Sequence, residues 1–189
     1  MDINQYQPKS GRVITESGVI VNPYDFISGD QGNIETIHKK IHEQKHFNAT
    51  HFFTAVADNA TARIRVVKGV GKVPHIVANI TALGDCHYSL KTGTSYTSDG
   101  TEIIPKNNVV GSEHEAVSKV YHTPTIDVAG DVFMGPLILV GGRAGQALGG
   151  DSGFRNEIVL LADNSDLLIE ITNKSGQARD ISIDISFYE

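Results

Sequence analysis

Residues 180–188 run Asp-Ile-Ser-Ile-Asp-Ile-Ser-Phe-Tyr, and this segment decides the fold class. Isoleucine or phenylalanine occupies every second position, and serine or aspartate separates them. Successive side chains of a β-strand point to opposite faces of its sheet, whereas a helix needs an apolar repeat of three to four residues. The segment therefore predicts a strand that buries one face in a core and exposes the other to water.

The same two-residue period continues towards the N-terminus as far as residue 46. Clusters of Asp, Asn, Ser and Gly, which favour turns, separate the predicted strands. These strands are residues 46–56, 61–67, 73–83, 86–92, 116–126, 132–140, 157–162, 167–172 and 180–188. Because no long helical segment lies between them, the sequence predicts an all-β fold, an antiparallel jelly-roll-like β-sandwich over residues 46–189.

Two segments precede the predicted sandwich. Residues 1–33 have no sustained period and too few apolar residues for a core, which predicts an extended N-terminal arm that orders against a partner. Residues 34–45 are predicted to form a short helix or linker, because Ile34, Ile37 and Ile41 recur at spacings of three and four. This isoleucine stripe is expected to need cover and to contact a second copy in a homo-oligomer, with a homotrimer as the expected state.

Charge and composition exclude several classes of protein. The 189 residues carry a formal net charge of −6 and no run of Lys or Arg longer than two, so no nucleic-acid partner is expected. The apolar stretches are far shorter than the roughly 18 residues that a membrane helix needs, so no membrane partner is expected. The N-terminus lacks the features of a secretion signal and Cys86 has no second cysteine to pair with, so synthesis in a reducing cytoplasm is expected.

One motif is typical of a hydrolase. Residues 150–153 run Gly-Asp-Ser-Gly, as around the nucleophile of chymotrypsin-like proteases, but Phe154 replaces the glycine expected next. No upstream segment resembles the one that supplies the histidine base of those enzymes. The glycine-rich residues 141–153 also lack the Gly-Lys-Ser/Thr ending of a phosphate-binding loop. The sequence therefore predicts a connecting loop here and no enzyme.

Histidine spacing gives the best candidate for a metal site. His38, His42 and His46 are spaced by four, which suits zinc or nickel on a continuous helix, but His46 is predicted to lie in a strand. The chain has neither a His-Glu-x-x-His motif nor the His-x-His pair of a cupin enzyme. Cys86 and His87 are predicted to point to opposite faces of a strand, with Cys86 buried. No metal and no cofactor is expected.

Several short segments resemble small virion proteins of tailed bacteriophages, namely their head decoration or cement proteins. They are IHEQKHF (41–47), TSDGT (97–101), NN (107–108), PTI (124–126), IEITN (169–173) and SFYE (186–189), with SGRV (10–13), ESG (16–18) and VNPYD (21–25) in the arm. The resemblance implies a jelly-roll trimer, made in the cytoplasm of a bacterial host and bound to the major capsid protein on the capsid exterior.

The resemblance and the residues lead to one functional hypothesis and one alternative. The hypothesis is a non-enzymatic structural protein that decorates and stabilises a phage capsid, anchored by its arm. The residues expected to contact the capsid are Arg12, Val13, Ile14, Val19, Val21, Asn22, Tyr24 and Phe26. The alternative is a carbohydrate- or receptor-binding module of a head fibre or tail. The absence of Trp and the thin spread of Tyr88, Tyr96 and Tyr121 disfavour it, since sugar rings usually stack on exposed aromatic platforms.

Overall fold

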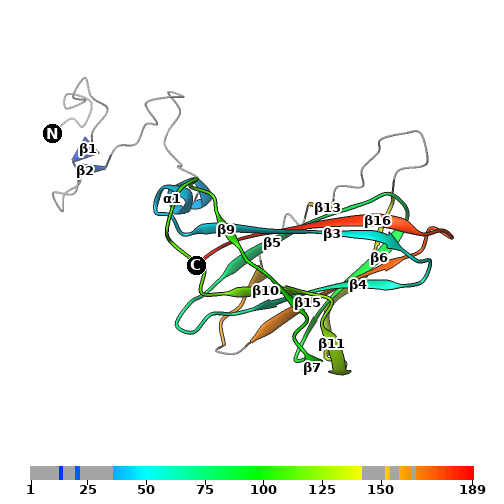
Figure 1. Ribbon diagram of the computed structural model, residues 1–189. Coiled ribbons are helices and arrows are strands. Elements are labelled where there is room, and N and C mark those ends of the chain that lie inside the picture. The colour runs from blue at the N-terminus through cyan, green and yellow to red at the C-terminus, as the bar shows by residue number, and fades with distance from the viewer. Residues whose placement is uncertain (1–12, 15–19, 22–35, 142–151, 154–157, 163–164) are drawn as a thin grey trace. The chain divides into compact units, whose positions relative to one another are not determined.

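The computed structural model describes residues 13–14, 20–21, 36–141, 152–153, 158–162 and 165–189 (Figure 1). The chain divides into two compact units, residues 1–43 and 44–189. In the first unit, β1 (Val13–Ile14) pairs antiparallel with β2 (Ile20–Val21), and α1 spans Thr36–His42. The last turn of α1 carries Lys39 and Lys40, whose positive charges interact favourably with the C-terminal end of the helix dipole.

The second unit contains two antiparallel sheets that pack face to face (Figure 1) and one separate two-stranded pair. Its strands are β3 (His46–Val56), β4 (Thr61–Val67), β5 (His75–Ala82), β6 (Cys86–Thr92), β7 (Ser95–Ser98), β8 (Thr101–Ile103), β9 (Lys106–Asn107), β10 (Lys119–His122), β11 (Thr125–Val128), β12 (Asp131–Leu139), β13 (Ser152–Gly153), β14 (Ile158–Val159), β15 (Asp166–Asn173) and β16 (Arg179–Tyr188). The first sheet has the order β12-β6-β15-β4-β10-β8. The second has the order β13-β5-β16-β3-β9, with β14 also paired to β5. The prediction of an all-β antiparallel sandwich is confirmed.

Strand β16 lies in the centre of the second sheet, between β5 and β3. Every second residue of β16 is buried, as the two-residue period predicts for a strand with one face in the core. These residues are Ile181, Ile183, Ile185 and Phe187. These side chains share one core with the inward-facing side chains of β4, β6 and β15. The rings of Phe187 and Phe47 stack with centroids 5.6 Å apart. Burying each large apolar side chain contributes about 1.5–3 kcal/mol, so β16 is central to holding the two sheets together.

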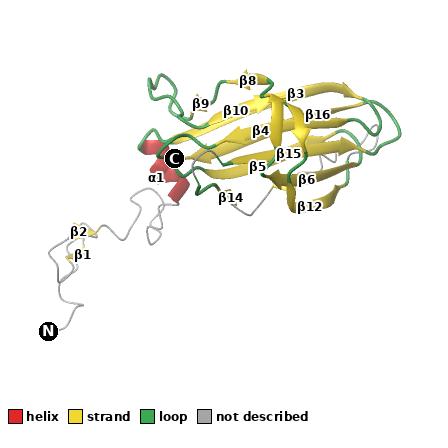
Figure 2. Cartoon of the chain, turned by 90° about the horizontal axis from the view of Figure 1, so that it is seen from below, coloured by secondary structure: helices red, strands yellow, loops and turns green. Residues whose placement is uncertain are grey.

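Between β6 and β12, residues 93–130 add strands at one side of the sandwich and form a pair that is separate from both sheets; we call this segment the excursion. Strand β10 extends the first sheet by pairing with β4, and β9 pairs with β3 of the second sheet. This excursion therefore joins both sheets at one side of the sandwich, and Figure 2 shows β8 and β9 on that side with β12 along the opposite edge. Strands β7 and β11 form a separate antiparallel pair, here called the ribbon, which projects from the sandwich in Figure 1.

The excursion differs from the sequence prediction of one strand over residues 116–126. The structure instead has β10 and β11, which belong to separate sheets. The ladder breaks at Thr123, whose φ is 55°, and at Pro124, which has no N–H to donate. Nearby, Gly100 has a φ of +90°, and a Cβ at this position would lie 2.2 Å from the carbonyl oxygen of His122. Only glycine fits where the chain bends from β7 into β8 at such close approach.

Candidate interaction surfaces

The residues predicted to bind a capsid lie in the first unit. Val13 and Ile14 form β1, and Val13 is the register partner of Val21 in β2. The β1–β2 pair thus brings these three predicted residues together. The other predicted contacts lie outside the described residues: Arg12, Val19, Asn22, Tyr24 and Phe26.

The predicted isoleucine stripe is represented by two described residues. Ile37 and Ile41 lie four residues apart in α1. Ile34 lies outside the described residues. Within the part of the chain that the structure describes, no helix has the length and apolarity to cross a membrane.

The motifs that resemble catalytic or metal sites are dispersed over several elements. His38 and His42 share α1, with their Nε2 atoms 2.9 Å apart, whereas His46 begins β3. Ser152 belongs to β13, which pairs with β5, and the two residues before it lie outside the described residues. Cys86 is buried as predicted, and this burial is the main cause that raises the pKa of its thiol to about 11. No group of three or more His, Cys, Asp or Glu among the described residues is arranged to hold a metal ion.

Paired charges cover part of the outer face of the first sheet. Glu170 of β15 accepts a hydrogen bond from Nε of Arg63 at 2.9 Å, and its other carboxylate oxygen lies 2.6 Å from Nζ of Lys91. Arg63 and Lys91 lie on β4 and β6, the strands on either side of β15. Burial opposes ionisation of Glu170, but the hydrogen bonds from Lys91 and Arg63 outweigh it and lower the pKa of its carboxyl. These three side chains tie three neighbouring strands together.

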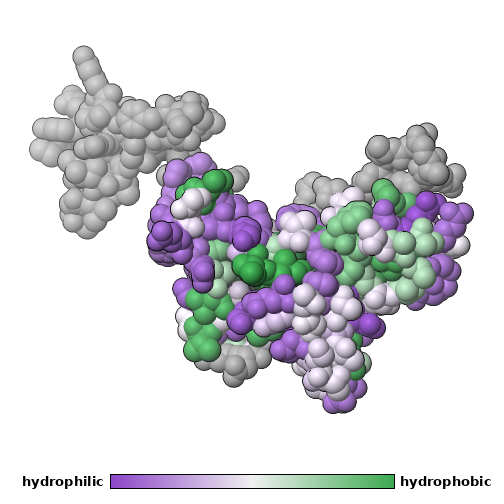
Figure 3. All heavy atoms as spheres, viewed as in Figure 1, coloured by the Kyte–Doolittle hydropathy of each residue, from purple (hydrophilic) through white to green (hydrophobic). Residues whose placement is uncertain are grey.

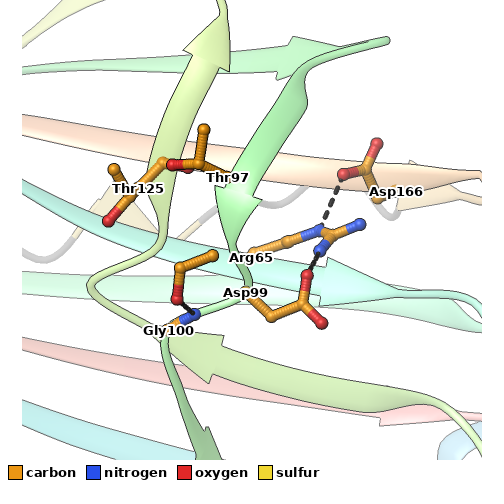
Figure 4. Close-up of polar contacts among 7 residues, drawn as sticks. Arg65, Thr97, Asp99, Gly100, Thr125 and Asp166 are labelled. Atoms are coloured by element: carbon orange, nitrogen blue, oxygen red, sulfur yellow. Dashed lines mark hydrogen bonds and ion pairs between the residues drawn. The ribbon is translucent and has the colours of Figure 1, made fainter.

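A second cluster fastens the ribbon to the same face. Arg65 of β4 donates a hydrogen bond from Nε to Asp166 of β15 at 2.9 Å, and its guanidinium also pairs with Asp99, which follows β7. The guanidinium carbon lies 3.9 Å from the ring centroid of Tyr96 in β7, a cation–π contact. Figure 4 shows β7 and β11 crossing the strands of the sheet, with Arg65 between Asp99 and Asp166. Arg65 thus connects the sheet to the ribbon by two contacts, with Tyr96 and Asp99, while its bond to Asp166 stays within the sheet.

Burial makes the ion pair at the base of this cluster costly to break. The side chains of Arg65 and Asp166 are only 16% and 8% exposed, so either charge would be costly without the other. Burial, and after it the neighbouring Asp166 carboxylate, raises the pKa of the Tyr96 hydroxyl. Arg65 pairs with both carboxylates of the cluster, those of Asp99 and Asp166, which indicates that the cluster has a structural role. The ribbon that it positions has a mostly pale and purple visible surface in Figure 3, consistent with its Ser, Thr and Asp residues.

Two stacked histidines bridge the sheets at the side where the excursion attaches. The rings of His51 in β3 and His122 in β10 have centroids 3.8 Å apart and planes inclined by 17°. Phe53 meets the His51 ring edge-on, with centroids 4.5 Å apart. Because β3 and β10 belong to different sheets, this stack closes the sandwich between them. Neither histidine belongs to a sequence motif, so only the fold reveals the pair.

The stack makes stability depend on pH. Burial, and then the positive charge of His122, lowers the pKa of His51 below its ordinary value of 6.5, and burial likewise lowers the pKa of His46. The unfolded chain binds these protons at the ordinary value. Below about pH 6.5 it therefore binds more protons than the folded chain, and the free energy of unfolding falls. The urea midpoint is expected to be lower at about pH 5.5 than at about pH 7.

Substitution of His51 distinguishes the contribution of the histidine stack to this pH dependence from the acid sensitivity of the rest of the protein. His51→Gln is expected to remove part of the difference between the two urea midpoints, because one of the histidines that resist protonation is lost. His87→Gln is the matched control, since His87 lies on the outer face of β6 and is the register partner of Thr172. An undiminished difference in His51→Gln would show that the stacked pair does not cause it.

No family model matches the chain, and no curated protein matches it in sequence. The surfaces described above are therefore the basis for a functional proposal. The charged cluster and the histidine stack fix the internal geometry of the sandwich.

Proposed function

We propose that this protein is a non-enzymatic structural protein of a tailed-phage virion. It decorates and stabilises the exterior of the capsid as a homo-oligomer, with three copies as the preferred number, and residues 1–33 anchor it to the major capsid protein. The observation that carries the proposal is the strand order of the two sheets, which supports a jelly roll.

Eight strand positions of the sandwich support the proposed jelly roll. Strands β13 and β14 both pair with the edge of β5 that is opposite β16, so they are counted as one strand position, represented by β14. Without the excursion, the strand positions in chain order are then β3, β4, β5, β6, β12, β14, β15 and β16. Numbered one to eight, they are arranged as 1-8-3-6 in one sheet and 2-7-4-5 in the other. This order supports a jelly roll, an architecture used by viral capsid proteins and also by lectins and cupins. The fold thus supports a virion role and makes a lectin-like module the competing proposal.

The two units have different proposed tasks. The sandwich supplies a rigid body, and the arm supplies the attachment. Extended segments add to exposed sheet edges through backbone hydrogen bonds, with alternate side chains in pockets. Ordering such an arm costs about 1–2 kcal/mol per residue in backbone entropy, so the anchoring contacts act collectively. Three arms on one trimer raise the effective concentration of the second and third contacts.

Deletion of residues 1–33 is expected to leave a folded protein that no longer binds capsids. Residues 44–189 form a compact unit with its own core, so the circular dichroism spectrum should remain that of a β-protein. The measurement is co-sedimentation with capsids of the encoding phage that were assembled without this protein. Full-length protein should saturate these capsids, and the truncated protein should bind at least roughly 100-fold more weakly because all anchors are lost.

Other outcomes of this experiment would contradict separate parts of the proposal. Saturation by the truncated protein at the full-length concentration would place the anchor on the sandwich. Failure of the full-length protein to bind would contradict capsid decoration itself. Mass spectrometry of purified virions then distinguishes the alternative, because a shell component is present in hundreds of copies. A carbohydrate- or receptor-binding module of a head fibre or tail is present in a handful.

A further inference from the structure

Strand β12 is an edge strand with little protection by charge. Among the described strands it pairs only with β6, and Figure 2 shows it along the border of the sandwich. The unpaired backbone groups of an edge strand invite association, and proteins usually protect such edges with charged side chains, above all lysine. The only charged residue of β12 is Asp131 at its start, and the others are apolar, glycine or proline.

Apolar side chains are exposed along this edge. The exposed fractions are 55% for Val132, 58% for Phe133, 41% for Leu137, 72% for Ile138 and 71% for Val140. We call these five residues the β12 patch. Together they present on the order of 500 Å² of apolar surface. This surface lies on both sides of the edge strand, because Ile138 pairs with the outward-facing His87 and Leu137 with Tyr88 of the core. Such a surface is typical of a site that a partner covers.

The β12 patch is suited to side-chain packing rather than to the addition of a further strand. Pro136 has no N–H to offer to a neighbouring strand. The register with β6 also shifts twice, between Val132 and Met134 and between Met134 and Leu137. Such irregularities bend and twist a strand, so a neighbour could not follow this edge over its whole length. The partner is therefore expected to present a complementary apolar surface.

We infer that the β12 patch is a contact between copies of this chain. A stable interface covers about 800 Å² of each partner, with an apolar centre and a polar rim, and the patch has the size of such a centre. Permanent contacts between identical chains are more apolar than transient contacts with other proteins. Copies with a net charge of −6 also repel one another, so their association needs an apolar surface. The inference rests on the homo-oligomer proposed above and adds the face that forms it.

Ile138→Asp tests the inference with little risk to the fold, because Ile138 is 72% exposed. Full-length wild-type protein is expected to be oligomeric by light scattering at micromolar concentration. The variant should be a folded monomer, because a charge in the apolar centre raises the dissociation constant by roughly 100-fold or more. Val110→Asp is the matched control. Val110 is 99% exposed between β9 and β10, so the same charge away from the patch should leave the wild-type mass unchanged.

Cysteine labelling provides a second measurement that introduces no charge. The native cysteine, Cys86, is buried, so a maleimide should report only on cysteines introduced by substitution. In the oligomer, Ile138→Cys should react roughly tenfold more slowly than Val110→Cys, because the interface covers position 138. Dilution to the monomer should remove this difference.

The outcomes separate this inference from the proposed function. A wild-type mass for Ile138→Asp, or equal labelling rates in the oligomer, would overturn the assignment of the β12 patch and leave the homo-oligomer intact. A monomeric wild-type protein would overturn both the patch and the homo-oligomer. Neither result would decide whether the protein binds capsids, which co-sedimentation tests separately. If Ile138→Asp does not fold, the labelling rates decide.

Discussion

Phe187→Ala is expected to lower the free energy of unfolding by about 3–5 kcal/mol. Phe187 is 1% exposed, and its ring stacks on Phe47 of the neighbouring strand. The substitution loses the transfer free energy of the ring and leaves a cavity between two sheets that can close only in part. Urea denaturation measures the change, at one fixed protein concentration because assembly would add to apparent stability.

Phe52→Ala is the matched control for this prediction. Phe52 lies on β3, as Phe47 does, but its side chain is on the opposite face and is 55% exposed. Its loss should change the free energy of unfolding by no more than about 0.5–1 kcal/mol. Similar losses in the two variants would contradict the assignment of the inner and outer faces of this sheet, and with it the meaning of the two-residue period.

The two-residue period predicts well those strands that alternate between core and outer face. The predicted bounds 46–56, 61–67 and 86–92 coincide with β3, β4 and β6. The period is less informative about where a strand ends. Residues 157–162 were predicted as one strand; of the described residues 158–162, Ile158 and Val159 pair with β5 as β14, and the N–H of Leu160 continues this register to the carbonyl of Pro74. Pro74 has no N–H to donate in return, so the ladder ends there although the apolar run continues.

Local patterns reveal only part of each surface. Arg63 and Arg65 alternate with apolar residues, so a charged outer face of β4 is predictable from the sequence. Their acidic partners on β15 lie 107 and 101 residues later, and the pairing follows from strand order, which no local pattern encodes. The β12 patch likewise cannot be predicted from a local sequence pattern alone. Its residues predict a strand, but their exposure results from the position of β12 at the edge of the sheet.

Arg65→Met is expected to lower the free energy of unfolding by about 3–5 kcal/mol. The substitution keeps most of the side-chain volume but leaves the Asp166 carboxylate, with 8% of its side chain exposed, without its cation. The cation–π contact with Tyr96 and the pairing with Asp99 are lost as well. The ribbon should loosen more than the sandwich, so its amides should exchange hydrogen faster than those of β16, which hydrogen-exchange mass spectrometry measures.

Lys119→Met is the matched control, because it also replaces a cation by methionine on the outer face of the same sheet. Lys119 lies 3.7 Å from Glu102, and the two side chains are 55% and 44% exposed. Exposed pairs of this kind contribute about 0–1 kcal/mol, so the variant should unfold near the wild-type urea midpoint. Equal losses for Arg65→Met and Lys119→Met would contradict a special role for burial.

The double variant Arg65→Met with Asp166→Leu distinguishes a buried charge from a lost contact. If the cost of Arg65→Met comes from the carboxylate left in a dry site, removal of that carboxylate should restore much of the lost free energy of unfolding. Exchange in the ribbon should nevertheless remain fast, because the contacts of Arg65 with Asp99 and Tyr96 are still absent. If the double variant recovers both the free energy of unfolding and the slow hydrogen exchange of the ribbon, packing alone positions the ribbon. Recovery of stability without recovery of ribbon protection would assign the orientation of the ribbon to Arg65.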